Sequence, residues 1–244
     1  MPKQPIKITL SIIVPVFNEE KGIENAIAQI YKDATLNPIK KIISSFEVII
    51  IDDGSFDNTG KIIEGQKSKY KNFKIIKHKK NQGLGAAIRD GIDHSSKEYI
   101  TYLPADGQVF LRDIYKGLEV APMADLILTY RDSRLDYNMY RHMLSSVLMI
   151  FMKIFFDLNF KDYNWVHIYK KNSLYLIKTK SKGVFYLGEV VARMHVGGFK
   201  ILEAEAGYNP RSTGVSKNAR LTIALQTLFD LLKLWWELKF KIQR

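Results

Sequence analysis

Two adjacent carboxylates, Asp52 and Asp53, directly follow an apolar run rich in β-branched residues at positions 46–51. Such a run is typical of a strand that is buried on both faces of a parallel sheet. Because adjacent carboxylates repel each other and are costly to desolvate, folding alone does not explain the pair. A rigidly held carboxylate can bind a base or a ribose hydroxyl. In the alternative, Asp52 only ends the strand, and Asp53 or Asp57 caps the next helix.

A second loop with binding chemistry follows the strand-like run 7–16. Pro15 cannot donate a hydrogen bond to a strand ladder and therefore marks the strand end. Phe17 offers a flat apolar face and Glu19 offers an acceptor, so the two can sandwich a base and hold a ribose hydroxyl. A strand exit followed by a helix cap explains these residues equally well.

A third loop, residues 104–108, places Asp106 and Gln108 after the strand-like run 99–103. Hard cations such as Mg²⁺ and Mn²⁺ take oxygen ligands and need only one or two protein carboxylates when phosphates supply the rest. Asp106 is therefore a candidate metal ligand, with Gln108 beside it. A plain Asp-Gly turn is the alternative.

Basic residues form a fourth candidate group. Arg131, Arg134 and Arg141 come after the strand-like run 124–129, and Arg211 and Lys217 lie in a loop rich in Ser, Thr and Gly. Arginine binds phosphate through two parallel hydrogen bonds, and hydroxyl and backbone N–H groups add donors. The alternative is a solvated basic surface.

A glycine-rich segment, residues 81–85, reads Asn-Gln-Gly-Leu-Gly. It lacks the spacing and the terminal Lys-Ser/Thr of a P-loop. We therefore interpret Gly83 and Gly85 as part of a glycine turn that admits a close backbone approach.

Alternating strand and helix patterns position these loops in the first half of the chain. Strands are expected over 7–16, 46–51, 72–77, 99–103 and 124–129, and helices over 19–36, 57–69, 85–95 and 111–120. This alternation predicts an α/β fold with a mostly parallel central sheet flanked by helices. Right-handed crossovers bring the loops that follow the strands to one edge, where such sheets bind ligands.

The second half of the chain contains two apolar helical patterns, over 141–156 and from about residue 220 to the end. The last helix has a narrow polar stripe on an otherwise apolar surface with two tryptophans, which is typical of an amphipathic helix at a membrane interface. A core helix for the first segment and a subunit contact for the last are the alternatives. We expect one domain over 1–217, followed by the amphipathic C-terminal helix over 218–244. Neither a signal peptide nor a transmembrane helix is predicted.

The composition narrows the kind of partner. The 244 residues carry a formal net charge of +12, which favours an anionic ligand or surface. Cysteine is absent, so disulfides, thiolate metal sites and a cysteine nucleophile are excluded. The acidic loops share the ligand edge with the basic residues, which argues against nucleic-acid binding.

Together, these loops resemble the family 2 glycosyltransferases of the GT-A fold, and more closely the dolichyl- or polyprenyl-phosphate hexose transferases. The matching motifs are Val14-Pro-Val-Phe-Asn-Glu, Ile51-Asp-Asp-Gly-Ser, Asn81-x-Gly-x-Gly-x-Ala, Ala105-Asp-Gly-Gln, Gly188-Glu189 and Arg211-x-x-Gly-x-Ser-Lys217. The resemblance covers roughly residues 8–217. One departure is Pro104, which replaces the first carboxylate of the family's Asp-x-Asp metal motif.

The resemblance implies an inverting transfer of a hexose from a nucleotide-sugar, with Mg²⁺ or Mn²⁺ held by Asp106 and Gln108. The nucleotide-sugar would contact Pro15, Phe17, Glu19, Asp52, Asp53, Gly83, Ala105, Asp106, Gln108 and Arg131. The acceptor phosphate would contact Arg211, Ser216 and Lys217. Asp106, Arg131 and Arg211 would support catalysis, and Glu189 would act as the base if the acceptor is a sugar hydroxyl.

The same resemblance implies a polyprenyl-phosphate acceptor, dolichyl or undecaprenyl, and a peripheral location on the cytoplasmic face of a membrane. A second copy of the chain and a small membrane-anchoring subunit are further candidate partners. Two other functions stay open at this point. One is a transferase that extends a saccharide or a surface polysaccharide, and the other is a degenerate transferase-like protein that binds nucleotide without turnover.

Overall fold

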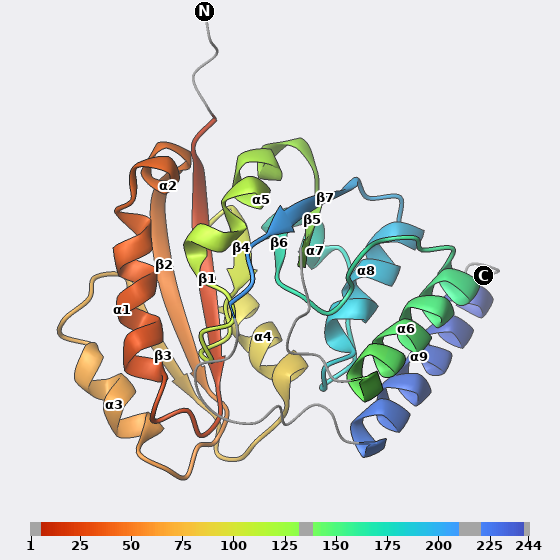
Figure 1. Ribbon diagram of the computed structural model, residues 1–244, viewed down its shortest axis with the longest axis horizontal. Coiled ribbons are helices and arrows are strands. Elements are labelled where there is room, and N and C mark those ends of the chain that lie inside the picture. Colours follow the sequence, from red (N-terminus) through yellow and green to blue (C-terminus); the bar gives the residue numbers. More distant parts are fainter. Residues whose placement is uncertain (1–5, 132–138, 210–220, 242–244) are drawn as a thin grey trace, which may run out of the picture.

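Seven strands form one sheet flanked by helices (Figure 1). The computed structural model describes residues 6–131, 139–209 and 221–241. The strand order is β3-β2-β1-β4-β6-β5-β7, and β6 runs antiparallel to both of its neighbours. The strands are β1 (Ile8–Val16), β2 (Ile43–Asp52), β3 (Phe73–Lys77), β4 (Tyr99–Tyr102), β5 (Leu126–Arg131), β6 (His167–Lys170) and β7 (Ile201–Ala206).

The helices account for most of the remaining described chain. They are α1 (Ile23–Ala34), α2 (Asn37–Ile42), α3 (Thr59–Gln66), α4 (Leu84–Asp93), α5 (Tyr115–Val120), α6 (Met139–Phe156), α7 (Lys171–Tyr175), α8 (Tyr186–Val196) and α9 (Leu221–Lys241), with 3₁₀ turns at Leu111–Ile114 and Ala121–Met123. The predicted α/β fold with a mostly parallel sheet and a C-terminal helix is confirmed. The helix expected over 19–36 begins only at Ile23, and α2 follows it, because Pro38 favours a new first turn.

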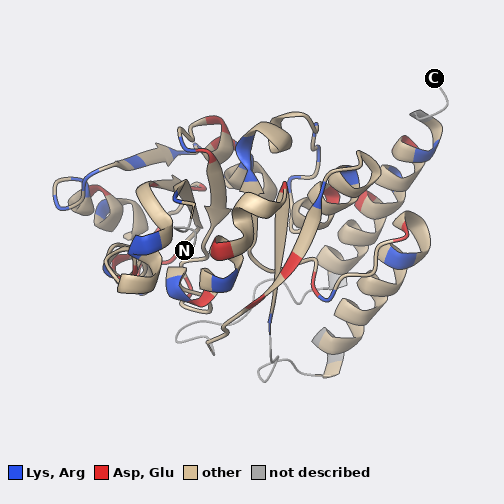
Figure 2. Cartoon of the chain, turned by 90° about the horizontal axis from the view of Figure 1, so that it is seen from above, with Lys and Arg blue, Asp and Glu red and all other residues tan. Residues whose placement is uncertain are grey.

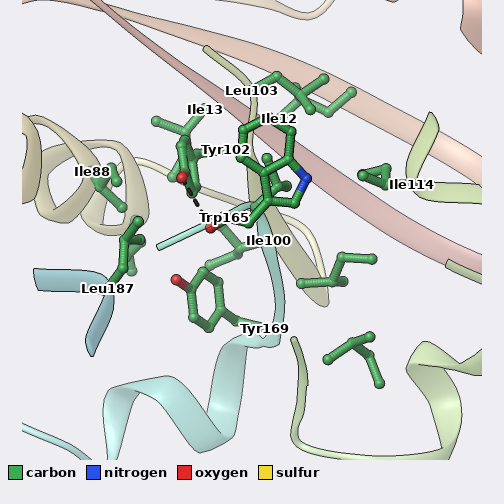
Figure 3. Close-up of a cluster of buried hydrophobic side chains, with 14 of the residues drawn as sticks. Ile12, Ile13, Ile88, Ile100, Tyr102, Leu103, Ile114, Trp165, Tyr169 and Leu187 are labelled. Atoms are coloured by element: carbon green, nitrogen blue, oxygen red, sulfur yellow. Dashed lines mark hydrogen bonds between the residues drawn. The ribbon is translucent and has the colours of Figure 1, made fainter. Parts of the chain in front are cut away.

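The core lies between the central strands and the helices that cover them. Ile13 and Ile100 from β1 and β4 lie on the face of the sheet that Ile88 from α4 and Leu187 from α8 cover, whereas Ile12 points to the opposite face (Figure 3). All of these side chains are buried. Burial on both faces of the sheet explains why β1 and β2 read as nearly continuous apolar runs rather than alternating ones.

The parallel strands place three described loops and the end of β5 at one edge of the sheet. β1 pairs in parallel with β2 and β4, and β5 runs in the same direction because β6 lies antiparallel between β4 and β5. The segments that follow β1, β2 and β4 therefore leave the sheet at the same edge, where β5 also ends at Arg131. These are the segments that carry the predicted binding chemistry.

Helices α6 and α9 lie side by side at one end of the sheet (Figure 1). Leu231 and Leu234 of α9 are buried, and the ring of Trp235 lies 5.1 Å from that of Phe155 on α6. The C-terminal helix is thus packed on the rest of the protein rather than standing apart from it. Among the described residues, no helix combines the length and the apolar character needed to cross a membrane.

Candidate nucleotide-sugar site

A cleft of about 1470 Å³ opens where the loops after β1, β2 and β4 meet the end of β5, and it continues between α6 and α9. Its lining contains every predicted nucleotide-sugar-binding residue except Asp52. The residues concerned are Pro15, Phe17, Glu19, Asp53, Gly83, Ala105, Asp106, Gln108 and Arg131. The structure therefore brings together side chains that are far apart in the sequence, at the edge where open α/β sheets bind ligands.

Backbone-to-side-chain hydrogen bonds join the loops after β1 and β2. The N–H of Asn18 donates to Ser55 Oγ (3.0 Å), and the N–H of Phe56 donates to Asn18 Oδ1 (3.0 Å). The N–H of Glu19 donates to Thr59 Oγ1 (2.8 Å). Asn18 adopts a left-handed conformation with φ of 54°, which Asn tolerates better than most residues. These bonds hold the two loops in one arrangement at the cleft.

An aromatic pair stands at this junction. The rings of Phe17 and Phe56 lie 5.9 Å apart, edge to face, and Phe56 is 84% exposed. Phe17 lines the cleft, and stacking on a base stays a prediction for it. Phe56 was not singled out from the sequence, although an apolar residue inside the polar run 52–58 is a signal that could have found it.

The two adjacent carboxylates are both buried, and each accepts hydrogen bonds from the protein itself. Asp52 Oδ1 accepts from the N–H of Ser55 (2.9 Å) and closes the turn after β2, away from the cleft lining. Asp53 lines the cleft and accepts from the N–H groups of Gln82 (2.8 Å) and Gly83 (2.9 Å). The pair is therefore not a symmetric clamp, and Asp53 is the member that faces the cleft.

Asp57 lies just before α3, whose N-cap position is Asn58. Asp57 Oδ1 accepts from the N–H of Thr59 (2.9 Å), the first residue of α3. Asp53 does not cap α3, because its carboxylate turns toward residues 82–83 at the start of α4. The sequence left both assignments open.

Gly83 permits a close approach between the start of α4 and the segment 181–183. The N–H groups of Gly85 and Ala86 donate to the carbonyl oxygen of Lys182 (2.8 and 3.3 Å). A Cβ atom on Gly83 would lie 2.6 Å from that oxygen, and Gly83 has a φ of +95°. The prediction of a close backbone approach is confirmed. The first N–H groups of α4 thus bind a carbonyl of the chain rather than facing the cleft as an anion site.

We predict opposite effects on stability for two Gly→Ala substitutions. Gly83→Ala should lower the free energy of unfolding by more than about 1 kcal/mol, because both its φ and its contact with Lys182 oppose a side chain. Gly65→Ala in α3 should leave it unchanged or raise it by up to about 1 kcal/mol, since a Cβ there meets open space. Urea unfolding of the two variants checks both values, and equal effects would contradict the assigned close approach.

Asp106 and Gln108 form a tight turn at the cleft. The N–H of Gln108 donates to Asp106 Oδ1 (3.1 Å), and Gln108 Nε2 donates to Tyr208 Oη (3.0 Å). No group of three or more His, Asp or Glu side chains that could hold a metal occurs in the described part of the chain. A single carboxylate beside an amide still fits Mg²⁺ or Mn²⁺, because such cations keep water and take substrate phosphates as ligands.

Arg131 lies in the cleft wall in a fixed orientation. Its Nε and Nη2 donate to Asp162 Oδ2 (3.0 and 2.7 Å), and both side chains are almost fully buried. The guanidinium carbon lies 4.5 Å from the ring centre of Trp165, which also lines the cleft. Tyr102 Oη donates to the carbonyl oxygen of Trp165 (Figure 3). The sequence motifs do not predict Asp162 and Trp165, although the polar and aromatic run 160–165 just before β6 is a signal for them.

Glu189 does not line the cleft. It is 2% exposed, and its carboxylate accepts from the N–H groups of Lys180 (3.0 Å) and Ser181 (2.7 Å). Arg193 Nε, one turn along α8, pairs with the same carboxylate at 2.8 Å. These partners hold the carboxylate of Glu189 within the protein, and its role as a base for a sugar-hydroxyl acceptor stays a prediction.

Ion pairs next to Glu189 also connect α9 to α8 and to the segment 180–181. Glu237 Oε2 lies 2.7 Å from Lys180 Nζ and 3.4 Å from Arg193 Nη2. Burial raises the pKa of Glu237, but the contacts with Lys180 and Arg193 outweigh burial and lower the pKa to about 2. Glu189 and Glu237 thus join the segment 180–181, α8 and the C-terminal helix.

Three predicted acceptor-phosphate residues lie outside the described residues. They are Arg211, Ser216 and Lys217, within 210–220. Arg134 lies in 132–138, which is also outside the described part. The assignments of these residues stay as predictions.

A cleft at the carboxyl edge of a mostly parallel sheet, with acidic loops after β2 and β4, defines an α/β protein of the GT-A type. The chain belongs to glycosyl transferase family 2, whose sequence profile matches residues 11–178. This membership confirms the resemblance that the motifs indicated.

Two relatives show the range of the similarity. A dolichyl-phosphate beta-glucosyltransferase of Dictyostelium discoideum is 36% identical over 114 residues, which cover 46% of this chain and 35% of that protein. The undecaprenyl-phosphate 4-deoxy-4-formamido-L-arabinose transferase of Pectobacterium atrosepticum is 24% identical over 229 residues, covering 91% of this chain and 66% of that protein. The match thus spans about a third of the length of the first relative.

A solved structure shares the fold. It is glucosyl-3-phosphoglycerate synthase from Mycobacterium tuberculosis in complex with Mn²⁺, UDP-glucose and phosphoglyceric acid. The TM-score is 0.70 with 13% sequence identity, over 93% of this chain and 80% of that one. At this identity the likeness establishes the GT-A fold alone.

Proposed function

We propose that this protein transfers a hexose from a nucleotide diphosphate sugar to the phosphate of a polyprenyl lipid, with inversion at the anomeric carbon. The observation that carries the proposal is the composition of the cleft. One end is formed by the polar strand-end loops, and the other by the apolar helices α6 and α9. A polar donor and a lipid-linked acceptor need these two surroundings in one continuous site. The names of the two relatives, a dolichyl-phosphate and an undecaprenyl-phosphate transferase, support the same acceptor class.

The polar end suits the donor. Phe17 offers its ring to the base, and Asp53 and Gly83 border the same part of the cleft. Asp106, with Gln108, would hold Mg²⁺ or Mn²⁺, which when bound would offset the negative charge of the diphosphate. Arg131 adds a positive charge in the cleft wall, in an orientation that Asp162 maintains.

The proposed reaction needs no strong general base. An oxygen of the lipid phosphate forms the new bond to the anomeric carbon. The bond from that carbon to the diphosphate oxygen breaks, and the electron pair leaves with the nucleoside diphosphate. A phosphate monoester is already anionic near neutral pH. This is consistent with a cleft that Glu189 does not line, and it favours a phosphate acceptor over a sugar hydroxyl.

The apolar end suits the lipid and a membrane surface. Exposed apolar side chains recur along α6 and α9 at helical spacing. Figure 2 shows few charged residues on α6, and the charged residues of α9 all lie from Asp230 onward. The exposed apolar residues are Met143, Val147, Ile150 and Ile154 on α6 and Leu225, Phe229, Leu232, Trp236 and Phe240 on α9. We propose that this face rests in the interface of the cytoplasmic leaflet, with the protein attached peripherally.

Charges placed on this face should weaken membrane binding. Replacing both Phe229 and Trp236 by Glu removes two exposed apolar side chains, each worth about 1.5–3 kcal/mol when buried, so vesicle binding should fall by at least about tenfold. Cosedimentation with vesicles containing anionic lipid measures this. Met123→Glu changes a side chain that is 62% exposed but lies in the 3₁₀ turn before β5, and should bind like the unmodified protein. Equal binding of the two variants would contradict the proposed orientation.

Turnover of donor with lipid acceptor tests the function directly. Purified protein with Mg²⁺ or Mn²⁺ is incubated with a panel of nucleotide-sugars, with and without a polyprenyl phosphate, and release of nucleoside diphosphate is measured. Release that depends on the lipid is the expected result. Release that depends instead on an added saccharide would move the assignment to a saccharide-extending transferase. Nucleotide binding without release under any condition would identify a degenerate transferase-like protein.

A further inference from the structure

The imidazole ring of His78 lies between two carboxylates directly behind the cleft wall. His78 follows β3, and its side chain is 4% exposed. Its Nδ1 is 2.6 Å from Asp53 Oδ1, and its Nε2 is 2.7 Å from Asp90 Oδ2 on α4. The backbone N–H of His78 donates to the carbonyl oxygen of Asp52 (2.9 Å). The ring thereby connects the ends of β2 and β3 with α4.

This geometry requires a protonated ring. Ionised carboxylates only accept hydrogen bonds, and a neutral imidazole carries a single N–H. Two carboxylate partners at hydrogen-bond distance therefore call for N–H groups on both nitrogens, which is the imidazolium form. Burial lowers the pKa of His78, but the hydrogen bonds to Asp53 and Asp90 outweigh burial, so the pKa is raised above its ordinary value.

Asp53 connects this ring to the cleft. The carboxylate of Asp53 accepts a hydrogen bond from the ring of His78. It also accepts hydrogen bonds from the N–H groups of Gln82 and Gly83. Asp53 and Gly83 both line the cleft, whereas His78 and Asp90 do not. Loss of one donor would let the carboxylate rotate, and the turn that it holds would lose its fixed position.

We propose that His78 is a positioning residue of the donor subsite. As an imidazolium held by Asp53 and Asp90, it fixes the carboxylate of Asp53 and, through it, the turn at residues 82–83 against which the nucleotide-sugar packs. The inference rests on the proposed function of the cleft as a donor site. His78 does not touch the donor, so its effect should fall on the KM for the nucleotide-sugar more than on kcat.

The proposal predicts a loss of donor affinity at alkaline pH. Because the pKa is raised, the contacts of the imidazolium are complete below that value and are lost as pH rises through it. When the His78 ring loses a proton, one of the two carboxylates faces the lone pair of a ring nitrogen. Among the described residues, the charged groups that face the ring are Asp53, in the loop after β2, and Asp90, on α4. Lys79 and Lys80, the next residues in the chain, are exposed.

The experiment measures donor KM and kcat from about pH 6 to about pH 10, a range that spans the titration of a raised histidine. In the unmodified protein the KM should rise by about tenfold toward the alkaline end. This is the change expected when the free energy of one charge-assisted hydrogen bond is lost. Asp90→Asn should move this rise to lower pH, because one stabilising carboxylate is gone. His78→Asn should show a raised KM that no longer varies with pH in this way. His195→Asn, an exposed histidine at the end of α8, is the matched control and should follow the unmodified protein.

A second readout does not depend on turnover. NMR titration of the His78 ring should give a pKa above the ordinary value of about 6.5, and Asp90→Asn should lower it. A titration at or below the ordinary value, or a KM profile that Asp90→Asn leaves unchanged, would overturn the proposal even if His78→Asn fails to fold. A raised titration in a protein that neither binds nor turns over any nucleotide-sugar would instead overturn the proposed function of the cleft, and with it the positioning role.

Discussion

Asp106→Asn is expected to lower kcat/KM for the nucleotide-sugar by about a hundredfold to a thousandfold, the typical loss when one group that stabilises developing charge is removed. The substitution removes the carboxylate that lies in the loop after β4 and lines the cleft. The fold should be retained, because an Asn side chain can still accept the hydrogen bond from the N–H of Gln108. The measurement is release of nucleoside diphosphate in the presence of polyprenyl phosphate and Mg²⁺ or Mn²⁺.

The matched control is Asp93→Asn, which neutralises an exposed carboxylate at the last residue of α4. This variant should keep the activity of the unmodified protein. Calorimetric binding of a nucleoside diphosphate with and without Mn²⁺ should show that Asp106→Asn loses the part of the affinity that depends on the metal. Unchanged activity of Asp106→Asn would refute the metal-ligand assignment, and Pro104 would then mark a site that works without a cation.

The second large effect is on stability. Asp162→Ala removes the carboxylate that pairs with Arg131, whose side chain is 4% exposed. Breaking a buried ion pair by removing one member is strongly unfavourable, so the free energy of unfolding should fall by about 3–5 kcal/mol. Urea unfolding followed by far-UV circular dichroism measures this change.

An exposed ion pair provides the comparison. Lys77 and Glu64 lie 2.9 Å apart, and each side chain is about half exposed. Glu64→Ala should therefore cost less than about 1 kcal/mol. If Asp162→Ala costs no more than Glu64→Ala, Arg131 is not held by Asp162, and its fixed orientation in the cleft wall would have to come from other contacts.

Much of the fold was accessible from local patterns. The apolar runs of β1, β2 and β4 and the helical periodicities between them predicted a mostly parallel sheet, and the structure confirms it. The position of β6 between β4 and β5 was not accessible, because its residues pair with strands more than 30 residues away in the chain. The sequence of a four-residue strand does not indicate which strands it pairs with or whether the pairing is parallel or antiparallel.

The sequence predicts the positions of some site residues but not of others. That Phe17 and Asp106 would lie at the ligand edge followed from their places directly after strands. Asp52 and Glu189 show the limit. Asp52 accepts a hydrogen bond within the loop after β2, and Glu189 accepts hydrogen bonds from the backbone N–H groups of residues 180–181. Neither residue lines the cleft.

The sequence by itself determined the edge of the sheet at which the acidic and amide residues collect, because strands joined by right-handed crossovers must end on the same side. It also determined that the last helix is amphipathic, since the spacing of its polar residues is a local property. Only the tertiary structure decided what each charged side chain does there. Asp53 is held by His78 and by the turn at Gly83, and Arg131 is held by Asp162. These partners are remote in the sequence, and a carboxylate or a guanidinium is available to a ligand only to the extent that folding has not already given it partners.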